Sequence, residues 1–320
     1  MRKLFRIILA VGIAVALMVV LARSVDLRTQ DLEGLVFDPF WALMALLGYF
    51  PCVLLRAMRM RHFAPDTYRE QGLGKMSAVL VTHQAANHVL PMKLGELVYP
   101  LLLRTLGKES VAKGLGATIL MRFADLLGLG VVVCIASGVA EGIEPSLARA
   151  YGLGGMLSVA IALLLLARGD RVFIFLSGLL GSVTPPFLER ITGDLGEALG
   201  AMENSALNWA LLIAESVLLW GGLVGIHCAL GCAFGLCLPP EMMALGALGS
   251  VLSGYLPVGS LLNLGTVELG WVATLPLIGV LPTDALIFGT AIHLSLVCLT
   301  VAYALFALMI LGWIRRGTSR

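Results

Sequence analysis

The sequence predicts an all-helical, polytopic integral membrane protein with about six transmembrane helices and two re-entrant helical hairpins. The first observation is composition: 59% of the 320 residues are hydrophobic and 13% are charged, whereas soluble domains contain about 25% charged residues. The second is that the chain is a series of long apolar runs, two of which are interrupted by Pro, Gly and polar residues. The net charge of +2 is too small to indicate a nucleic-acid partner.

Six apolar runs are expected to span the membrane. They are residues 1–22, Phe40–Leu55, Val111–Gly138, Tyr151–Ala167, Ala206–Ala229 and Leu286–Trp313. The first is interpreted as an uncleaved helix, because Leu21-Ala22-Arg23 is a poor signal-peptidase site. The basic residues 56–62 are interpreted as the end of the second span. Residues 168–205 contain a short apolar run, Pro185-Pro186 and a polar stretch, and are expected to lie at the cytoplasmic interface.

The first interrupted region is residues 76–104. One helix of this length would measure about 43 Å, whereas the hydrocarbon core is only about 30 Å thick. Pro91 lacks an N–H group and Gly95 is a poor helix former. We therefore expect a hairpin that enters and leaves on the same side, with its tip at residues 89–92. Irregular backbone at that depth is tolerated only next to protein or a wet cavity, so the hairpin is expected to line an intramembrane site.

The second interrupted region starts at Met242, breaks near Pro257 and runs on to Val280. The order of spans and hairpins is then the same in two halves, about 1–140 and 150–316, of a single transmembrane domain. Each half has three spans, so the second is predicted to be inverted relative to the first. Paired broken segments of this kind indicate a transporter site near the midplane.

Most Lys and Arg residues fall in segments that lie on one side if both interrupted regions are re-entrant. By the positive-inside rule, both termini are expected to be cytoplasmic, in a multi-pass protein of the cell (inner) membrane.

Charged residues inside the apolar regions are the candidate site. Arg122 and Asp125 share a helix face, as do Lys93 and Glu96, and intramembrane charge usually marks a pathway. A half-helix starting near Met92 would add a positive dipole end. We expect Lys93 and Arg122 to form a phosphate seat; the alternative is a structural ion pair between helices.

Glu268, which follows Gly265, is the counterpart of Glu96 in the second half. Inverted repeats are expected to bring these two carboxyl groups close together at the midplane. Each could exchange a proton during a transport cycle unless Lys93 or Arg122 pairs with it, or could balance an amine on a head group. The alternative is that both carboxylates only tie hairpin N–H groups together.

The sequence gives little indication of metal binding, disulfide formation or catalysis. The five His residues are scattered, so no metal ligand set is expected, and the six Cys residues are interpreted as small buried hydrophobes. A disulfide among Cys228, Cys232 and Cys237 is the alternative. No catalytic motif is present and no soluble segment is long enough for a catalytic domain, so we expect neither an enzyme nor a cofactor.

Three motifs resemble the transmembrane domain of lysylphosphatidylglycerol synthases, a family that includes stand-alone UPF0104 proteins. The first family motif, roughly Asn-x-x-x-Pro-x-Arg-x-Gly-Glu-x-x-Arg, reads here as Asn87, Pro91, Lys93, Gly95, Glu96 and Tyr99. The second, roughly Glu-Arg-x-x-Asp, reads as Met121, Arg122 and Asp125. The third, roughly Pro…Gly-Gly-Leu-Gly-x-x-Glu, reads as Pro257, Asn263, Gly265 and Glu268. The resemblance covers nearly the whole chain.

The chain departs from these motifs at Lys93, Tyr99 and Met121, and in the disrupted Gly pair. Replacing an Arg removes a bidentate phosphate ligand. The residues that the resemblance implies for substrate binding are Asn87, Lys93, Gly95, Glu96, Tyr99, Arg122, Asp125, Asn263, Gly265 and Glu268.

The family's aminoacylating domain is absent here, so the resemblance implies movement of a lipid across the bilayer. The expected ligand is an anionic phospholipid or a polyprenyl-phosphate lipid. Two alternatives stay open. One is a non-transporting subunit that presents lipid to a separate aminoacyl- or glycosyltransferase; the other is a membrane transferase with Glu96 or Glu268 as base.

Overall fold

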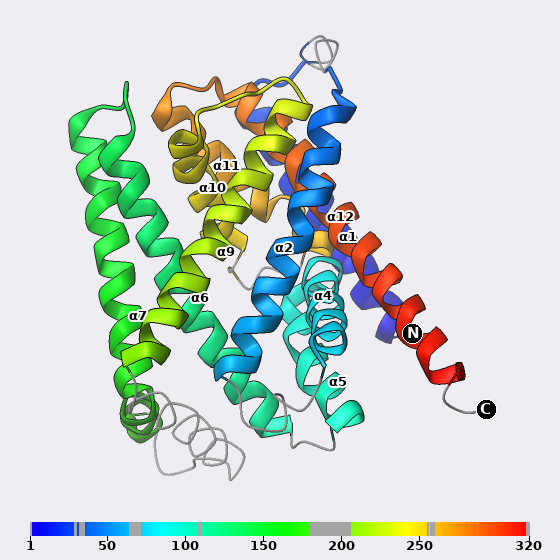
Figure 1. Ribbon diagram of the computed structural model, residues 1–320. Helices are drawn as coiled ribbons and strands as arrows, with labels where there is room; N and C mark the ends of the chain where they lie inside the picture. Colours follow the sequence, from blue (N-terminus) through cyan, green and yellow to red (C-terminus); the bar gives the residue numbers. More distant parts are fainter. Residues whose placement is uncertain are drawn as a thin grey trace.

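The computed structural model is entirely helical over the residues that it describes (Figure 1). These are residues 2–28, 31, 36–63, 72–107, 111–179, 206–254, 256 and 260–317. Side chains are described for these residues except 2–8, 63, 92, 93, 105–107, 169–179, 206 and 311–317. The all-helical fold class is therefore confirmed.

Long helices form most of the bundle. They are α1 (Arg2–Ser24), α2 (Pro39–Phe63), α6 (Val111–Val139), α7 (Pro145–Leu179), α9 (Ala206–Ala233) and α12 (Pro282–Gly317). Helix α7 packs along α6, and α2 packs along α9, while α1 and α12 lie together at the opposite edge from α7 (Figure 1).

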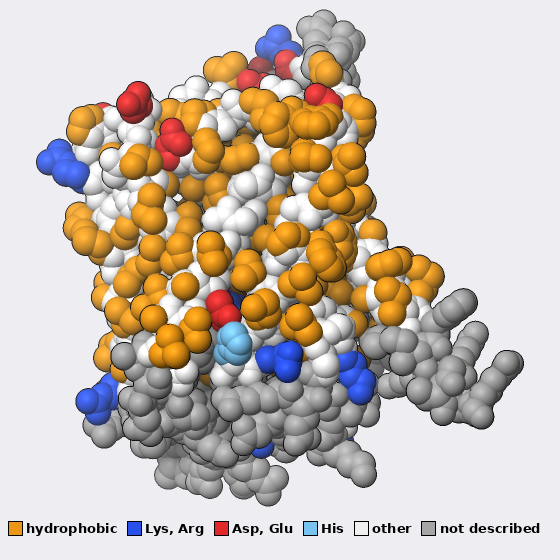
Figure 2. All heavy atoms as spheres, viewed as in Figure 1, with side chains coloured by type: hydrophobic (Ala, Val, Ile, Leu, Met, Phe, Trp, Pro, Cys, Tyr) orange, Lys and Arg blue, Asp and Glu red, His pale blue; other side chains and the backbone are white. Residues whose placement is uncertain are grey.

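Six segments of the described chain are long and apolar enough to cross a membrane. Five overlap spans expected from the sequence; the sixth, Leu261–Ile278, belongs to the second interrupted region. The described part of the first expected span contributes a shorter apolar stretch, Leu9–Ser24. Hydrophobic side chains cover the middle of the visible face, and charged ones gather toward its two ends (Figure 2). The chain is thus a multi-pass membrane protein.

The first interrupted region folds back on itself at the expected position. Helix α4 (Leu73–Val89) ends at Leu90, whose backbone is extended (φ −85°, ψ 133°). A 3₁₀ helix, η2 (Pro91–Leu97), and α5 (Val98–Gly107) then return to the end of the bundle where α4 began (Figure 1). Gly95 is required here, because a Cβ atom would overlap the backbone of Ala86 and Asn87.

The second interrupted region reverses in the same way at the other end of the bundle (Figure 1). Helix α10 (Pro240–Gly254) is followed by η3 (Leu261–Asn263), α11 (Thr266–Thr274) and η4 (Leu275–Ile278). The turn before α11 has left-handed backbone at Leu262, Asn263 and Gly265 (φ 57°, 57° and 84°). Asn and Gly tolerate this conformation, which is why the third motif carries them. The depth of both hairpins in a membrane and the inverted repeat stay predictions.

The expected end of the second span is wrong. Helix α2 does not stop at Leu55 but continues to Phe63, which places the basic residues of 56–62 within the helix. The apolar segment of α7 ends at Arg168, close to the expected end of the fourth span at Ala167; the backbone kinks there (φ −141°, ψ 19°) and the helix continues as far as Leu179. The rest of the expected interfacial segment, residues 180–205, lies outside the described residues.

A disulfide joins Cys232 at the end of α9 to Cys237 in the following loop, with Cα atoms 4.4 Å apart. The alternative reading of this cysteine cluster is therefore correct for two of its members. Cys228 has a free thiol, and Cys52 is buried, as a small hydrophobe would be.

Candidate functional site

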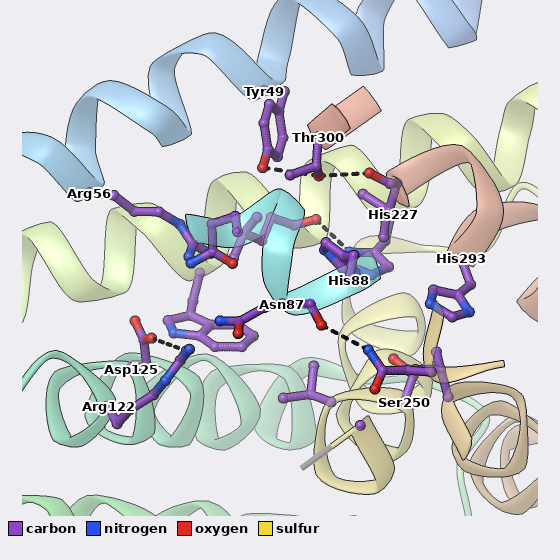
Figure 3. Close-up of a pocket in the computed structure, with 18 of the residues that line it drawn as sticks. Tyr49, Arg56, Asn87, His88, Arg122, Asp125, His227, Ser250, His293 and Thr300 are labelled. Atoms are coloured by element: carbon purple, nitrogen blue, oxygen red, sulfur yellow. Dashed lines mark hydrogen bonds and ion pairs between the residues drawn. The ribbon is translucent and has the colours of Figure 1, made fainter. Parts of the chain in front are cut away.

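A cavity of about 190 Å³ lies between the two hairpins and the long helices α2, α6, α9 and α12. One end, on the left in Figure 3, carries Arg56, Arg122 and Asp125. The other end carries His227 and His293. The cavity thus has an arginine end built by the first half of the chain and a histidine end that includes helices of the second half.

The arginine end is held by a network of ion pairs. Arg122 contacts Glu96 through Nη2 and lies 3.4 Å from Asp125 Oδ2 through Nη1. Arg59 Nη2 donates to Asp125 Oδ1 at 2.5 Å, and Nη1 donates to Ser216 Oγ at 3.1 Å. The predicted Arg122–Asp125 pair is present, but Arg122 is shared by two carboxylates rather than left open for a phosphate.

Arg56 is the cation that the sequence interpretation missed. It lines the cavity, is half-buried, and makes no ion pair or hydrogen bond with any residue that the structure describes. The expected basic end of span two is instead an inward-facing charge at Arg56 and a buried one at Arg59, which is 2% exposed. Arg56 therefore offers a guanidinium to a ligand that enters the cavity.

The first hairpin contributes a polar wall. His83 Nε2 donates to Glu96 Oε2 at 3.1 Å, because a carboxylate can only accept. Asn87 Nδ2 donates to Glu96 Oε1 at 3.1 Å. The two hairpins meet where Asn263 Nδ2 donates to the main-chain oxygen of Asn87 at 3.1 Å (Figure 3). Residues from the first and third motifs are thus in direct contact.

Not all predicted site residues face this cavity. Those that line it are Asn87, Glu96, Arg122, Asp125 and Asn263. Tyr99 is 1% exposed and lies against the His83 ring in a smaller cavity of about 30 Å³. Gly95 and Gly265 shape the hairpin turns.

The expected half-helix near Met92 needs correction. The chain forms the short 3₁₀ helix η2 there, and the α-helix starts only at Val98. The side chain of Lys93 lies outside the described residues, so its part in a phosphate seat stays a prediction.

Glu268 does not sit beside Glu96 on the cavity surface. It is 0% exposed, its Oε2 accepts from the Gly265 N–H at 2.7 Å, and its Oε1 lies 2.7 Å from His293 Nδ1. The left-handed Gly265 turn points that N–H back at the carboxylate. Glu268 therefore acts on the cavity through His293, which lines it.

Three polar atoms of cavity-lining residues are buried without a hydrogen-bond partner among the described residues. They are Asn87 Oδ1, Trp220 Nε1 and His293 Nε2. A buried polar atom without a hydrogen bond is costly, so a polar ligand or water in the cavity would satisfy these three atoms; other buried polar atoms without a partner lie elsewhere in the described chain.

A second, apolar cavity of about 470 Å³ adjoins the arginine end. It shares Glu96, Arg122, Asp125 and Trp220 with the first cavity and is otherwise lined mainly by apolar side chains. Most of these apolar side chains come from α6. Leu252 of α10 also lines the cavity, and because its side chain is 53% exposed, the cavity reaches the surface of the bundle. The adjoining cavity can thus hold an apolar chain attached to a charged group that lies in the central cavity.

Within the described part of the chain, no group of three His, Cys, Asp or Glu side chains is placed to hold a metal ion. The arginine end of the polar cavity, with Arg56 and Arg122, instead adjoins an apolar cavity that Arg122 also lines.

These features define a polytopic helical membrane protein with a polar intramembrane cavity. The chain belongs to the lysylphosphatidylglycerol synthase TM region family, whose model matches residues 7–312. Searches of curated proteins and of solved structures returned no match. Membership of this family indicates a role connected with membrane lipids.

Proposed function

We propose that this protein moves an anionic lipid across the bilayer, with the head group in the central cavity and the acyl or polyprenyl tail in the adjoining apolar cavity. The observation that carries the proposal is Arg56, a half-buried guanidinium that lines the cavity and makes no direct ion pair with a described residue, although its charge also acts on the Asp125 carboxylate. A cation held partly out of water is costly unless an anion pairs with it. A lipid phosphate supplies that anion.

The shape of the two cavities supports a lipid over a small soluble anion. They share four lining residues, so a head group beside Arg56 leaves its tail along α6. Asn87 Oδ1 adds an acceptor and Trp220 Nε1 a donor, which suits a phosphodiester that also carries hydroxyl or amine groups.

Movement of tail-labelled fluorescent phosphatidylglycerol in reconstituted liposomes tests the proposal. We expect faster exchange between leaflets than in protein-free liposomes, and slower movement of the matching phosphatidylcholine. Binding of phosphatidylglycerol without movement would overturn transport and favour a subunit that presents lipid to a separate lipid-modifying enzyme.

The orientation belongs to the same proposal: both termini are cytoplasmic and the α9–α10 end of the bundle faces outside. The Cys232–Cys237 disulfide lies at that end, and disulfides persist in oxidising compartments. A cysteine placed at Thr283 should then react with a membrane-impermeant reagent added from outside, while one at Gly317 should not. The reverse labelling pattern would overturn the orientation.

A further inference from the structure

The Glu268–His293 pair is a buried ionisable unit that phosphate binding at the arginine end does not use. Glu268 is 0% exposed and His293 is 3% exposed. They come from α11 and α12, and Oε1 and Nδ1 are 2.7 Å apart. Since a carboxylate can only accept, Nδ1 is the protonated nitrogen, and the proton-binding position that varies is Nε2.

That Nε2 atom is buried, lacks a partner among the described residues, and belongs to a side chain that lines the cavity. In the neutral imidazole it carries a lone pair and repels an anion. In the imidazolium it is an N–H donor with a positive charge. Only the protonated form can therefore bind an anionic group from the cavity.

The Glu268 carboxylate behind His293 is the counter-charge available to an imidazolium at that depth. With neutral His293 the pair carries one net negative charge in a buried place, and with the imidazolium it is neutral. Burial penalises an uncompensated charge much more than a hydrogen-bonded ion pair. An anion at Nε2 then adds a second partner to the imidazolium.

The surroundings of His293 add few other charges. The α4 ring of His88 is 6.3 Å from it between centroids, and His227 reaches the same end from α9, with Nδ1 bonded to the Leu223 carbonyl oxygen at 2.7 Å. On α11 the ionisable group that faces His293 is Glu268, and the side chains of η4 are all apolar. Among the described side chains of α1, Arg23 is ionisable, and it lies in the last turn of that helix. From α2, Tyr49 lines the cavity.

We propose that Glu268 and His293 form a proton-gated anion seat at the histidine end of the cavity, which binds a phosphate group only when Nε2 carries a proton. Binding the anion and binding the proton then strengthen each other by the same factor. For its physiological ligand this seat rests on the proposed lipid transport, since it would give a head group a second position beyond Arg56. It would also link that step to the proton concentration on the side from which the seat is reached.

Calorimetry on the whole protein in zwitterionic nanodiscs tests the seat. The probes are dihexanoyl phosphatidylglycerol, dihexanoyl phosphatidylcholine and inorganic phosphate. We expect phosphatidylglycerol to bind about tenfold more tightly at about pH 5.5 than at about pH 8. Titrations in buffers of different ionisation enthalpy should show proton uptake on binding.

His293→Gln should bind with one affinity at both pH values and take up no proton. Glu268→Gln should weaken the tightening at about pH 5.5, because Nδ1 of the imidazolium loses its carboxylate partner. The matched control is His62→Gln, on a half-exposed side chain outside the cavity that pairs with Glu215, and it should behave as wild type. Monodisperse elution and a single cooperative thermal transition show that each variant is folded.

An unchanged pH response in folded His293→Gln would overturn the seat, as would a wild type with no pH response. Proton-linked binding of inorganic phosphate alone that is lost in His293→Gln would support the seat with a free anion as ligand, because the proton that phosphate itself takes up is the same in both proteins. The lipid-movement assay separates the two proposals. Proton-linked binding without movement defeats transport only, whereas movement without proton linkage defeats the seat only.

Discussion

Arg56→Gln is expected to reduce both the binding and the movement of an anionic lipid by about ten- to a hundredfold, because a hydrogen bond to a charged group contributes ~1.5–3 kcal/mol. Arg56 lines the cavity without a direct ion pair among the described residues, and the nearby Asp125 carboxylate keeps its ion pairs with Arg59 and Arg122 when Arg56 is lost. Folding should therefore be affected little. Nanodisc binding and liposome movement of phosphatidylglycerol measure the effect.

The matched control is Arg149→Gln. Arg149 is exposed and its Nε donates to the Pro145 carbonyl oxygen at 3.1 Å, far from the cavity lining. It should retain wild-type binding and movement. Wild-type activity in a folded Arg56→Gln protein would mean that the cavity does not hold the head group through this residue.

Arg59→Met is expected to lower the free energy of unfolding by about 3–5 kcal/mol, the usual cost of removing one partner of a buried ion pair. Arg59 and Asp125 are 2% and 5% exposed and are joined at 2.5 Å. The variant leaves the Asp125 carboxylate deep in the bundle with only Arg122 at 3.4 Å. Denaturant titration of the purified protein in mixed micelles measures the change.

The double variant Arg59→Met, Asp125→Leu should recover much of this stability, since an apolar pair of similar volume costs less than a lone buried charge. Arg149→Met serves as the control and should be neutral. A loss below about 1 kcal/mol in Arg59→Met, the size typical of an exposed pair, would assign this ion pair a minor structural role.

The different effects expected for two arginines three residues apart show what the sequence could and could not predict. The helical class followed from the long apolar runs, and the first hairpin turn followed from Pro91 and Gly95. Arg56 and Arg59 resembled the basic end of a span, because the sequence pattern is the same whether such residues face head groups or a cavity. The packing of α2 against α9 decides between these positions.

One signal was available in the length of that span. Residues 40–55 would make a helix of only about 24 Å, shorter than the ~30 Å hydrocarbon core. The helix therefore had to continue past Arg56 to cross the membrane, which brings that charge inside.

The histidine end offered no comparable signal. Glu268 and His293 lie 25 residues apart on different helices, and a single His inside an apolar run carries no spacing information. Likewise, the inverted-repeat pattern led us to predict that Glu96 and Glu268 lie close together, whereas in the structure Glu268 is buried behind His293. Contacts between hairpins depend on how the two halves dock, which periodicity does not encode.

Photo-crosslinking tests most directly whether the head group enters the central cavity; it uses phosphatidylglycerol with a diazirine in its head group, in reconstituted membranes, followed by peptide mass spectrometry. We expect labelled residues of α2, α4 and α6 around Arg56, Asn87 and Arg122, and much weaker labelling at these positions in Arg56→Gln. Labelling confined to outward-facing side chains such as Val139 and Leu207, which are 59% and 66% exposed, would contradict it.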